Sequence, residues 1–158
     1  MLSDFEKLAS TAGELLRAKS YKLVTAESCT GGLLSAAITS VAGSSMWFER
    51  GFVTYSNESK QEVLGVQTVE EFGAVSEQTA CAMARGALKN SHAEVSLAIT
   101  GVAGPDGGTK SVGIVWIACA VRDESTRAML YHFKGDRQSV REQAVSAALS
   151  LLFDALQL

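Results

Sequence analysis

The chain has 158 residues, of which 47% are apolar and 20% charged, and its formal net charge is −3. This length predicts a single domain over residues 1–158, and the lack of a basic run argues against nucleic acid as a partner. No apolar run is long enough to span a membrane, and the N-terminus lacks the basic-then-apolar order of a signal peptide, so we expect a cytoplasmic protein with no membrane partner.

The cysteines and histidines offer little to a disulfide framework or a metal centre. Cys29, Cys81 and Cys119 are an odd number without a Cys-x-x-Cys pair, which is typical of reduced thiols. His92 and His132 have no neighbouring carboxylate pattern. We therefore expect neither a metal site nor a histidine-based catalytic triad.

The first part of the chain predicts a helix, a strand and a second helix. Apolar side chains recur at a helical period over residues 3–19. A short strand follows near 21–26, and helical spacing returns over about 30–41, with Gly43 at its end. The strand-to-helix junction therefore falls within residues 25–32.

Residues 25–32 read Thr-Ala-Glu-Ser-Cys-Thr-Gly-Gly and place hydroxyl and thiol groups at this junction. Thr30, followed by Gly31 and Gly32, is typical of a capped helix start, whose free backbone N–H groups can hold an oxyanion or a phosphate. A tight turn with a good N-cap explains the same residues. The segment alone leaves both interpretations open.

A second strand-to-helix junction follows. Residues 44–49 predict a short turn or helical segment in which core packing is the favoured role of Trp47. Residues 50–56 predict a strand, and Asn57 is the expected N-cap of a helix from 58 to about 64.

Tyr55 thus falls at the end of that strand and Lys60 in the first turn of that helix. A helix N-terminus disfavours a cation, so we expect the pKa of Lys60 to be lowered. A solvated surface lysine is the alternative.

Two helices precede the third strand. Residues 68–71 have the spacing of a capping box, and Gly73 closes that very short helix. A longer helix over 76–90 opens at a serine and carries Cys81 as a small core residue.

The strand at 94–100 leads directly into 101–108, which holds four glycines and the only proline of the chain. Such a loop lets backbone N–H groups approach a ligand, although it lacks the endings of nucleoside-triphosphate and dinucleotide loops. A plain surface turn is the alternative.

The chain ends with a predicted β-hairpin, formed by 112–121 and 126–133, and a helix whose expected N-cap is Asp136. Arg137 and Arg141 stand one turn apart in that helix and can meet an anion, but exposed helix arginines usually bind nothing specific.

Strands interleaved with helices predict an α/β fold, a three-layer α/β/α sandwich with a mixed, mostly parallel sheet of about five strands. In such sheets, ligands bind beyond the carboxyl ends of the strands. We therefore expect the strand ends near residues 26, 55 and 100 to converge on one site.

Five sequence blocks in the right order resemble the CinA C-terminal domain family in its stand-alone form, over roughly residues 5–155. The blocks are TAESCTGG at 25–32, AGSSMWFERGFVTYSNESK at 42–60, GAVSEQTA at 73–80, TGVAGPDGG at 100–108 and FKGDR at 133–137. The enzymatic members of this family are PncC-type nicotinamide-nucleotide amidases. The resemblance implies hydrolysis of the carboxamide of nicotinamide mononucleotide to nicotinate mononucleotide and ammonia, without metal or cofactor.

The resemblance also implies a catalytic trio, with Ser28 as nucleophile assisted by Lys60 and Tyr55. A lysine of lowered pKa is a chemically reasonable base where no suitable histidine exists, and Tyr55 can relay the proton or orient that lysine. Cys29 is the rival nucleophile. Backbone N–H groups near Thr30 and Gly31 are the expected oxyanion donors.

The nucleotide substrate is expected to bind at two glycine-containing segments, with Arg137 a less favoured phosphate ligand. The candidate residues are Thr30, Gly31, Gly32, Thr100, Gly101 and Gly104. The segment 108–113 is shorter than in many family members, which bears on substrate binding. A catalytically silent nucleotide-binding or regulatory paralogue is the alternative function, an amidase for another amide is a third, and a homodimer is in keeping with the family.

Overall fold

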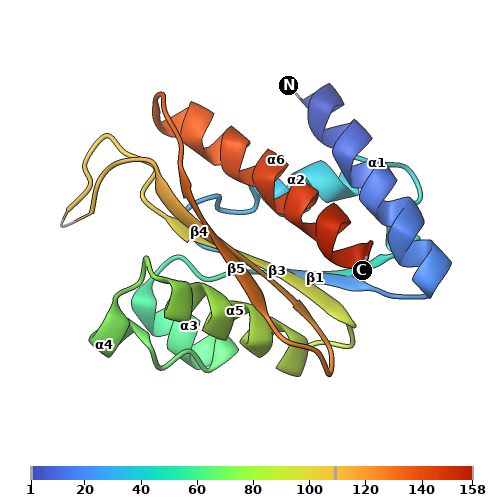
Figure 1. Cartoon of the computed structure of the whole chain (residues 1–158), viewed down its shortest axis with the longest axis horizontal. Helices are drawn as coiled ribbons and strands as arrows, with labels where there is room; N and C mark the ends of the chain where they lie inside the picture. Colours follow the sequence, from blue (N-terminus) through green and yellow to red (C-terminus); the bar gives the residue numbers. More distant parts are fainter. Residues whose placement is uncertain (1, 109, 158) are drawn as a thin grey trace.

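The computed structural model describes residues 2–108 and 110–157, which form three layers around a five-stranded sheet (Figure 1). The strands lie in the order β2-β1-β3-β4-β5. Their bounds are β1 Leu23–Glu27, β2 Phe48–Val53, β3 Val95–Gly101, β4 Ile114–Val121 and β5 Arg127–His132.

The sheet is mixed, as predicted. β1 pairs in parallel with both β2 and β3, whereas β4 is antiparallel to β3 and to β5. The β4–β5 hairpin is therefore confirmed. Because β1, β2 and β3 run in the same direction, their carboxyl ends meet at one edge of the sheet.

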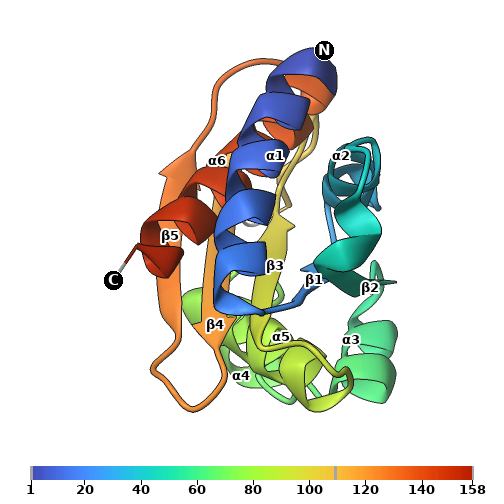
Figure 2. The ribbon, with the colours of Figure 1, turned by 90° about the vertical axis from the view of Figure 1, so that its right-hand side faces the viewer.

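Helices cover both faces of the sheet. In Figure 1, α1, α2 and α6 lie on one face and α3, α4 and α5 on the other, and Figure 2 shows the same separation after a quarter turn. The three-layer α/β/α prediction is thus confirmed. The bounds are α1 Leu2–Lys19, α2 Leu33–Thr39, η1 Ser44–Met46, α3 Asn57–Leu64, α4 Val69–Phe72, α5 Glu77–Lys89 and α6 Arg137–Leu156.

Each face of the sheet has its own apolar core. Side chains alternate along β1, so that Leu23 packs in the cluster beneath α1 and α6 while Val24 packs in the cluster beneath α5. Trp47 is only 3% exposed and belongs to the first cluster, which confirms its predicted core role. Burial on both faces explains why β1 and β3 lack a polar alternation.

The start of α2 differs from the prediction. The helix begins at Leu33 rather than near residue 30, and its N-cap is Gly32, which offers no side-chain cap. Gly31 and Gly32 have left-handed φ values of 56° and 105°, a conformation that an α-helix does not continue and that glycine adopts without strain. Thr30 is therefore not the cap of this helix.

Two other caps differ as well. The cap of α3 is Ser56 rather than Asn57, which is the first helical residue. The capping box predicted at 68–71 is wrong, because the Thr68 hydroxyl pairs with that of Thr79 at 2.8 Å and caps nothing. The predicted caps at Ser76 and Asp136 are confirmed.

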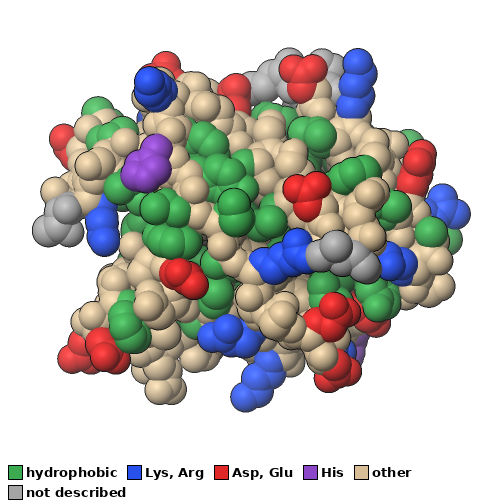
Figure 3. Space-filling model, in the orientation of Figure 1, with side chains coloured by type: hydrophobic (Ala, Val, Ile, Leu, Met, Phe, Trp, Pro, Cys, Tyr) green, Lys and Arg blue, Asp and Glu red, His purple; other side chains and the backbone are tan. Residues whose placement is uncertain are grey.

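The surface carries both signs of charge. On the face shown in Figure 3, Lys and Arg side chains are interspersed with Asp and Glu. None of the helices in the described part of the chain is long and apolar enough to cross a membrane.

Candidate active site

The carboxyl ends of β1, β2 and β3 border a cavity of about 340 Å³. It is lined by the junction after each of these strands and by the first residue of α6, so the predicted convergence of the three strand ends is confirmed. The lining includes Ser28, Cys29, Tyr55, Lys60, Thr100 and Arg137.

Ser28 and Lys60 meet inside this cavity. The Lys60 Nζ atom lies 3.0 Å from the Ser28 Oγ atom and donates a hydrogen bond to it. Ser28 is only 8% exposed, and its own N–H continues the β1–β3 ladder by donating to Ile99. A serine hydroxyl held against an amine in this way has the geometry that a nucleophile and its base require.

Lys60 is almost fully buried, with 1% of its surface exposed, which contradicts the alternative of a solvated surface lysine. Burial lowers the pKa of its ammonium, because the charged form loses hydration, while the nearby Cys29 thiol acts in the opposite direction. The predicted direction of the shift is confirmed, but its main cause is desolvation rather than the helix N-terminus. No acidic side chain of the described residues forms an ion pair with Lys60.

Cys29 is the weaker candidate for a nucleophile. It is 7% exposed and packs in the core beneath α1 and α6. Desolvation, with a smaller effect from Glu27, raises the pKa of its thiol to about 11. Since a protonated thiol is a poor nucleophile, this shift favours Ser28 over Cys29 as the candidate nucleophile.

Tyr55 contributes two different groups. Its backbone carbonyl accepts a hydrogen bond from Lys60 Nζ at 3.1 Å, while its side chain is 63% exposed at the cavity rim. There the phenol oxygen accepts from Arg137 at 3.2 Å. Arg137 also donates to the carbonyl of Gly104, so it links α6, the loop after β3 and Tyr55.

Glu27 holds the turn that carries Ser28. Its fully buried carboxylate accepts from the Thr30 hydroxyl at 2.6 Å, from the Leu34 N–H at 2.9 Å, and from the N–H and hydroxyl of Ser35 at 3.0 and 2.7 Å. The Glu27 carboxylate therefore accepts hydrogen bonds from the first N–H groups of α2, as a local N-cap side chain does in other helices.

Arg141 holds the same turn from α6. Its guanidinium donates to the carbonyl of Cys29 at 3.2 Å and to that of Thr30 at 3.0 Å. The Gly31 N–H donates to the Ser28 carbonyl. Within the described residues, the Thr30 N–H has no protein acceptor, and the Cys29 N–H is directed at its own thiol.

The glycine loop forms the opposite wall of the cavity. Thr100, Gly101 and Gly104 all line it, although the Thr100 hydroxyl is already bonded to the carbonyl of Ala74 at 2.7 Å. The other three predicted substrate-binding residues are Thr30, Gly31 and Gly32. They belong to the turn between β1 and α2 that carries Ser28, and they do not line the cavity.

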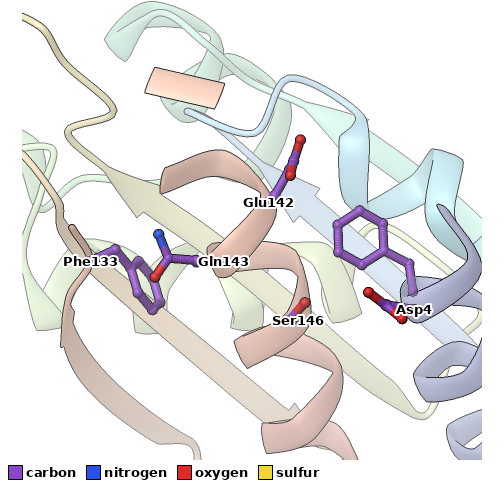
Figure 4. A pocket seen from close by; sticks show the side chains of 6 residues that line it. Asp4, Phe133, Glu142, Gln143 and Ser146 are labelled. Carbon is purple, nitrogen blue, oxygen red and sulfur yellow. The ribbon is translucent and has the colours of Figure 1, made fainter. Parts of the chain in front are cut away.

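A larger cavity of about 630 Å³ lies elsewhere, where the start of α1 faces α6 (Figure 4). Asp4, Phe133, Glu142 and Ser146 line it, with no lysine or histidine among its lining residues. Among its described lining residues, Ser146 therefore has carboxylates but no amine or imidazole nearby, unlike Ser28 beside Lys60 in the smaller cavity.

The model of the CinA C-terminal domain matches residues 5–156 of the sequence. The chain belongs to the CinA C-terminal domain family.

Relatives in this family include both short and long proteins. The nicotinamide-nucleotide amidohydrolase PncC of Escherichia coli K12 is 47% identical over 155 residues, which cover 96% of this chain and 94% of PncC. A CinA-like protein of Syntrophobacter fumaroxidans is 50% identical over 96% of this chain, but the match covers only 36% of that protein. The chain thus spans about a third of that longer relative.

Solved structures of CinA-family proteins share the fold. The competence/damage inducible protein CihA of Agrobacterium tumefaciens is 42% identical, with a TM-score of 0.93 over 98% of this chain and 96% of that one. A CinA superfamily protein of Klebsiella pneumoniae is 36% identical, with a TM-score of 0.94 over 97% of this chain and 98% of that one.

Sequence reasoning missed two residues of this CinA-family site. Glu27 was part of a recognised block, yet its role depends on donors supplied seven and eight residues later. The sequence predicts Arg141 as an exposed helix residue. In the structure it donates a hydrogen bond to the carbonyl of Cys29, which lies 112 positions away in the chain. A carboxylate ending a strand with no other charged residue is the local signal for Glu27, because a buried charge must find partners.

Proposed function

We propose that this protein is an amidohydrolase that converts nicotinamide mononucleotide into nicotinate mononucleotide and ammonia. The observation that carries the proposal is the 3.0 Å contact between Lys60 Nζ and Ser28 Oγ in a cavity at the sheet edge. The names of relatives matched over nearly their full length, nicotinamide-nucleotide amidohydrolase PncC, support the substrate.

In the proposed first step, neutral Lys60 takes the proton of the Ser28 hydroxyl as Oγ attacks the carboxamide carbon. Burial favours this step, because it lowers the pKa of Lys60 and so increases the fraction of free amine. The oxyanion is expected to face the backbone N–H of Cys29, the residue beside Ser28 that lines the cavity.

Collapse of this intermediate breaks the C–N bond, and the Lys60 ammonium returns its proton to the leaving nitrogen, which departs as ammonia. Water then attacks the Ser28 ester with Lys60 again as base, releasing the carboxylate product and restoring the serine. Tyr55 serves this chemistry by orienting Lys60 through its backbone carbonyl.

The same cavity supplies groups for the rest of the nucleotide. Arg137 at the cavity rim is the proposed ligand of the phosphate. Thr100, Gly101 and Gly104 form the wall beside it. In this proposal Thr30, Gly31 and Gly32 act from behind the cavity, by shaping the turn that presents Ser28.

Ammonia release from nicotinamide mononucleotide by purified, EDTA-treated protein tests the proposal. We expect turnover by the wild type, complete loss in Ser28→Ala and retention of most activity in Cys29→Ala, because the buried thiol stays protonated. The reverse pattern would make Cys29 the nucleophile. Saturable nucleotide binding without ammonia would indicate a silent binding module instead.

Assembly and location are parts of the same proposal. We propose a cytoplasmic homodimer. Cys29, Cys81 and Cys119 are all free thiols, as a reducing compartment maintains them, which supports the location and not the oligomeric state. Light scattering at micromolar concentration measures the oligomeric state, and a monomeric mass would contradict the dimer.

A further inference from the structure

The loop after β3 brings one acidic side chain, Asp106, into the lining of the cavity at Ser28. Asp106 is the only carboxylate among the described lining residues of that cavity. The loop turns back directly after it, because the Lys110 N–H donates to the Gly107 carbonyl at 3.0 Å. Asp106 itself is exposed, so its carboxylate lies at the cavity rim.

The Asp106 carboxylate is not used by the protein itself. Within residues 2–108 and 110–157, it forms no ion pair and accepts no hydrogen bond. The hydroxyl groups of the lining, by contrast, are already engaged. Ser28 accepts from Lys60, Tyr55 accepts from Arg137, and Thr100 donates to the carbonyl of Ala74. Asp106 is therefore a charged acceptor that the cavity leaves open for a ligand.

A cation belongs to the same part of the rim. The Arg137 guanidinium donates to the carbonyl of Gly104, which precedes Asp106 by two residues. Opposite charges placed in this way commonly pair, yet Arg137 and Asp106 form no ion pair in the part of the chain that the structure describes. The rim thus offers a cation and an anion that a ligand can engage separately.

A mononucleotide has groups that match both charges. With its carboxamide at Ser28 and its phosphate at Arg137, its ribose lies between the two. The two neighbouring ribose hydroxyls are hydrogen-bond donors, and an ionised carboxylate accepts through two oxygens. Carboxylates bind a ribose hydroxyl in dinucleotide sites as well.

The other parts of the nucleotide fit Asp106 less well. The phosphate carries the same sign of charge and is repelled by a carboxylate. The pyridinium ring is positively charged, but its carboxamide is attacked by Ser28, which is only 8% exposed, whereas Asp106 lies at the exposed rim. The ribose hydroxyls are therefore the donors that Asp106 is placed to accept from.

We propose that Asp106 is a specificity-determining residue whose carboxylate accepts hydrogen bonds from the two ribose hydroxyls of the nucleotide. This inference rests on the proposed function and deepens it, because it makes the site selective for ribose 5-phosphates over their 2-deoxy counterparts. The ribose takes no part in the bond changes at the carboxamide. Asp106 therefore contributes equally to binding of the substrate and of the transition state.

The test uses two probes that carry the sugar and the phosphate but no amide, ribose 5-phosphate and 2-deoxyribose 5-phosphate. Calorimetry measures the Kd of each for the wild type and for Asp106→Ala. We expect the wild type to bind ribose 5-phosphate about tenfold more tightly, as for one hydrogen bond to a charged group. In Asp106→Ala this ratio of Kd values should fall close to unity.

The ratio separates recognition from a structural role. A variant that only disturbs the loop weakens binding of both probes alike and keeps their ratio. Glu124→Ala, which removes an exposed carboxylate in the β4–β5 turn, is the control and should keep the wild-type ratio. In turnover of nicotinamide mononucleotide, Asp106→Ala should raise KM about tenfold and leave kcat unchanged.

A second comparison tests the pyridinium ring as the partner of Asp106. Binding of nicotinamide mononucleotide and of its reduced form, whose ring is uncharged, is measured in a Ser28→Ala background, where no turnover occurs. Adding Asp106→Ala should weaken both by the same factor, because both carry the ribose hydroxyls. A loss confined to the oxidised form would place the carboxylate at the ring and overturn the inference.

Equal Kd values of the two sugar phosphates in the wild type, a ratio that survives in Asp106→Ala, or no binding of either probe would also overturn it. If Asp106→Ala does not fold, Asp106→Asn decides: a smaller ratio supports the inference and an unchanged one overturns it. A wild type that distinguishes the probes through Asp106 but releases no ammonia counts against the proposed substrate alone. Ammonia release without such discrimination counts against the role of Asp106 alone.

Discussion

Two strand-to-helix junctions bring Ser28 and Lys60 together, and they are stabilised in opposite ways. At the β2–α3 junction, which carries Lys60, the helix is capped locally by the Ser56 hydroxyl, which accepts from the Ser59 N–H at 3.0 Å. At the β1–α2 junction, which carries Ser28, the cap position is a glycine and the buried Glu27 of the preceding strand replaces it.

The difference shows how firmly the backbone is fixed at each junction. A local cap leaves the surrounding backbone free to vary and can be replaced at small cost. A buried carboxylate that receives four donors fixes the whole turn between strand and helix, because each lost bond leaves another buried group unpaired. Ser28, the proposed nucleophile, therefore lies on the more rigidly determined junction, whereas the lowered pKa of Lys60, the proposed base, comes from burial.

The largest effect is expected for Lys60→Met, which removes the base at similar length. Loss of a general base lowers kcat by about a thousandfold. Burial makes the folded state bind the Lys60 proton more weakly than the unfolded chain, so the free energy of unfolding of the wild type rises with pH between the lowered pKa and the ordinary value of 10.5. Urea unfolding over that pH range should show this rise weakened in Lys60→Met.

The matched control is Lys89→Met, an exposed lysine at the end of α5. It should keep both the activity and the pH dependence of the wild type. Wild-type kcat in Lys60→Met would show that another group, such as the Tyr55 phenol, accepts the proton.

Glu27→Gln should have the next largest effect. The amide nitrogen of the introduced side chain cannot accept a hydrogen bond. It therefore faces a backbone N–H of α2, and two donors oppose each other. We expect a loss of about 2 kcal/mol in unfolding free energy, as for a buried unpaired donor, and a decrease in kcat of about tenfold or more from displacement of Ser28. Denaturant titration and steady-state kinetics measure the two effects.

Glu124→Gln, an exposed carboxylate in the β4–β5 turn, is the control for removing one negative charge. It should leave both quantities unchanged. Should Glu27→Gln destabilise the protein with kcat intact, the carboxylate would be a helix cap with no influence on the nucleophile.

This comparison also shows what the sequence could and could not predict. The local pattern around residues 54–60 correctly indicated a strand end, a capped helix and a lysine of lowered pKa, missing the cap by one residue. The pattern at 25–32 indicates a functional junction, but the prediction of Thr30 as the helix cap is wrong. Its hydroxyl instead donates to Glu27, a contact that exists only once the strand and helix have been folded back on each other.

The same reasoning applies to side chains whose roles depend on tertiary contacts. The hairpin and α6 were predicted because their hydrophobic periods are local. The burial of Lys60 and the reach of Arg141 to the turn are set by the packing of three layers, which no short window of sequence contains. For Tyr55, the sequence pointed to the phenol, whereas the carbonyl makes the contact with Lys60.

The smallest effect is expected for Ser56→Ala, the local counterpart of Glu27→Gln. Removing an N-cap hydroxyl costs about 1 kcal/mol of unfolding free energy, while kcat should stay within about twofold because Lys60 is held by burial and by bonds outside the cap. Denaturant titration and kinetics on the same sample give both numbers. A loss of kcat as large as that of Glu27→Gln would remove the distinction between the two junctions, since the base would then depend on its cap as the nucleophile depends on Glu27.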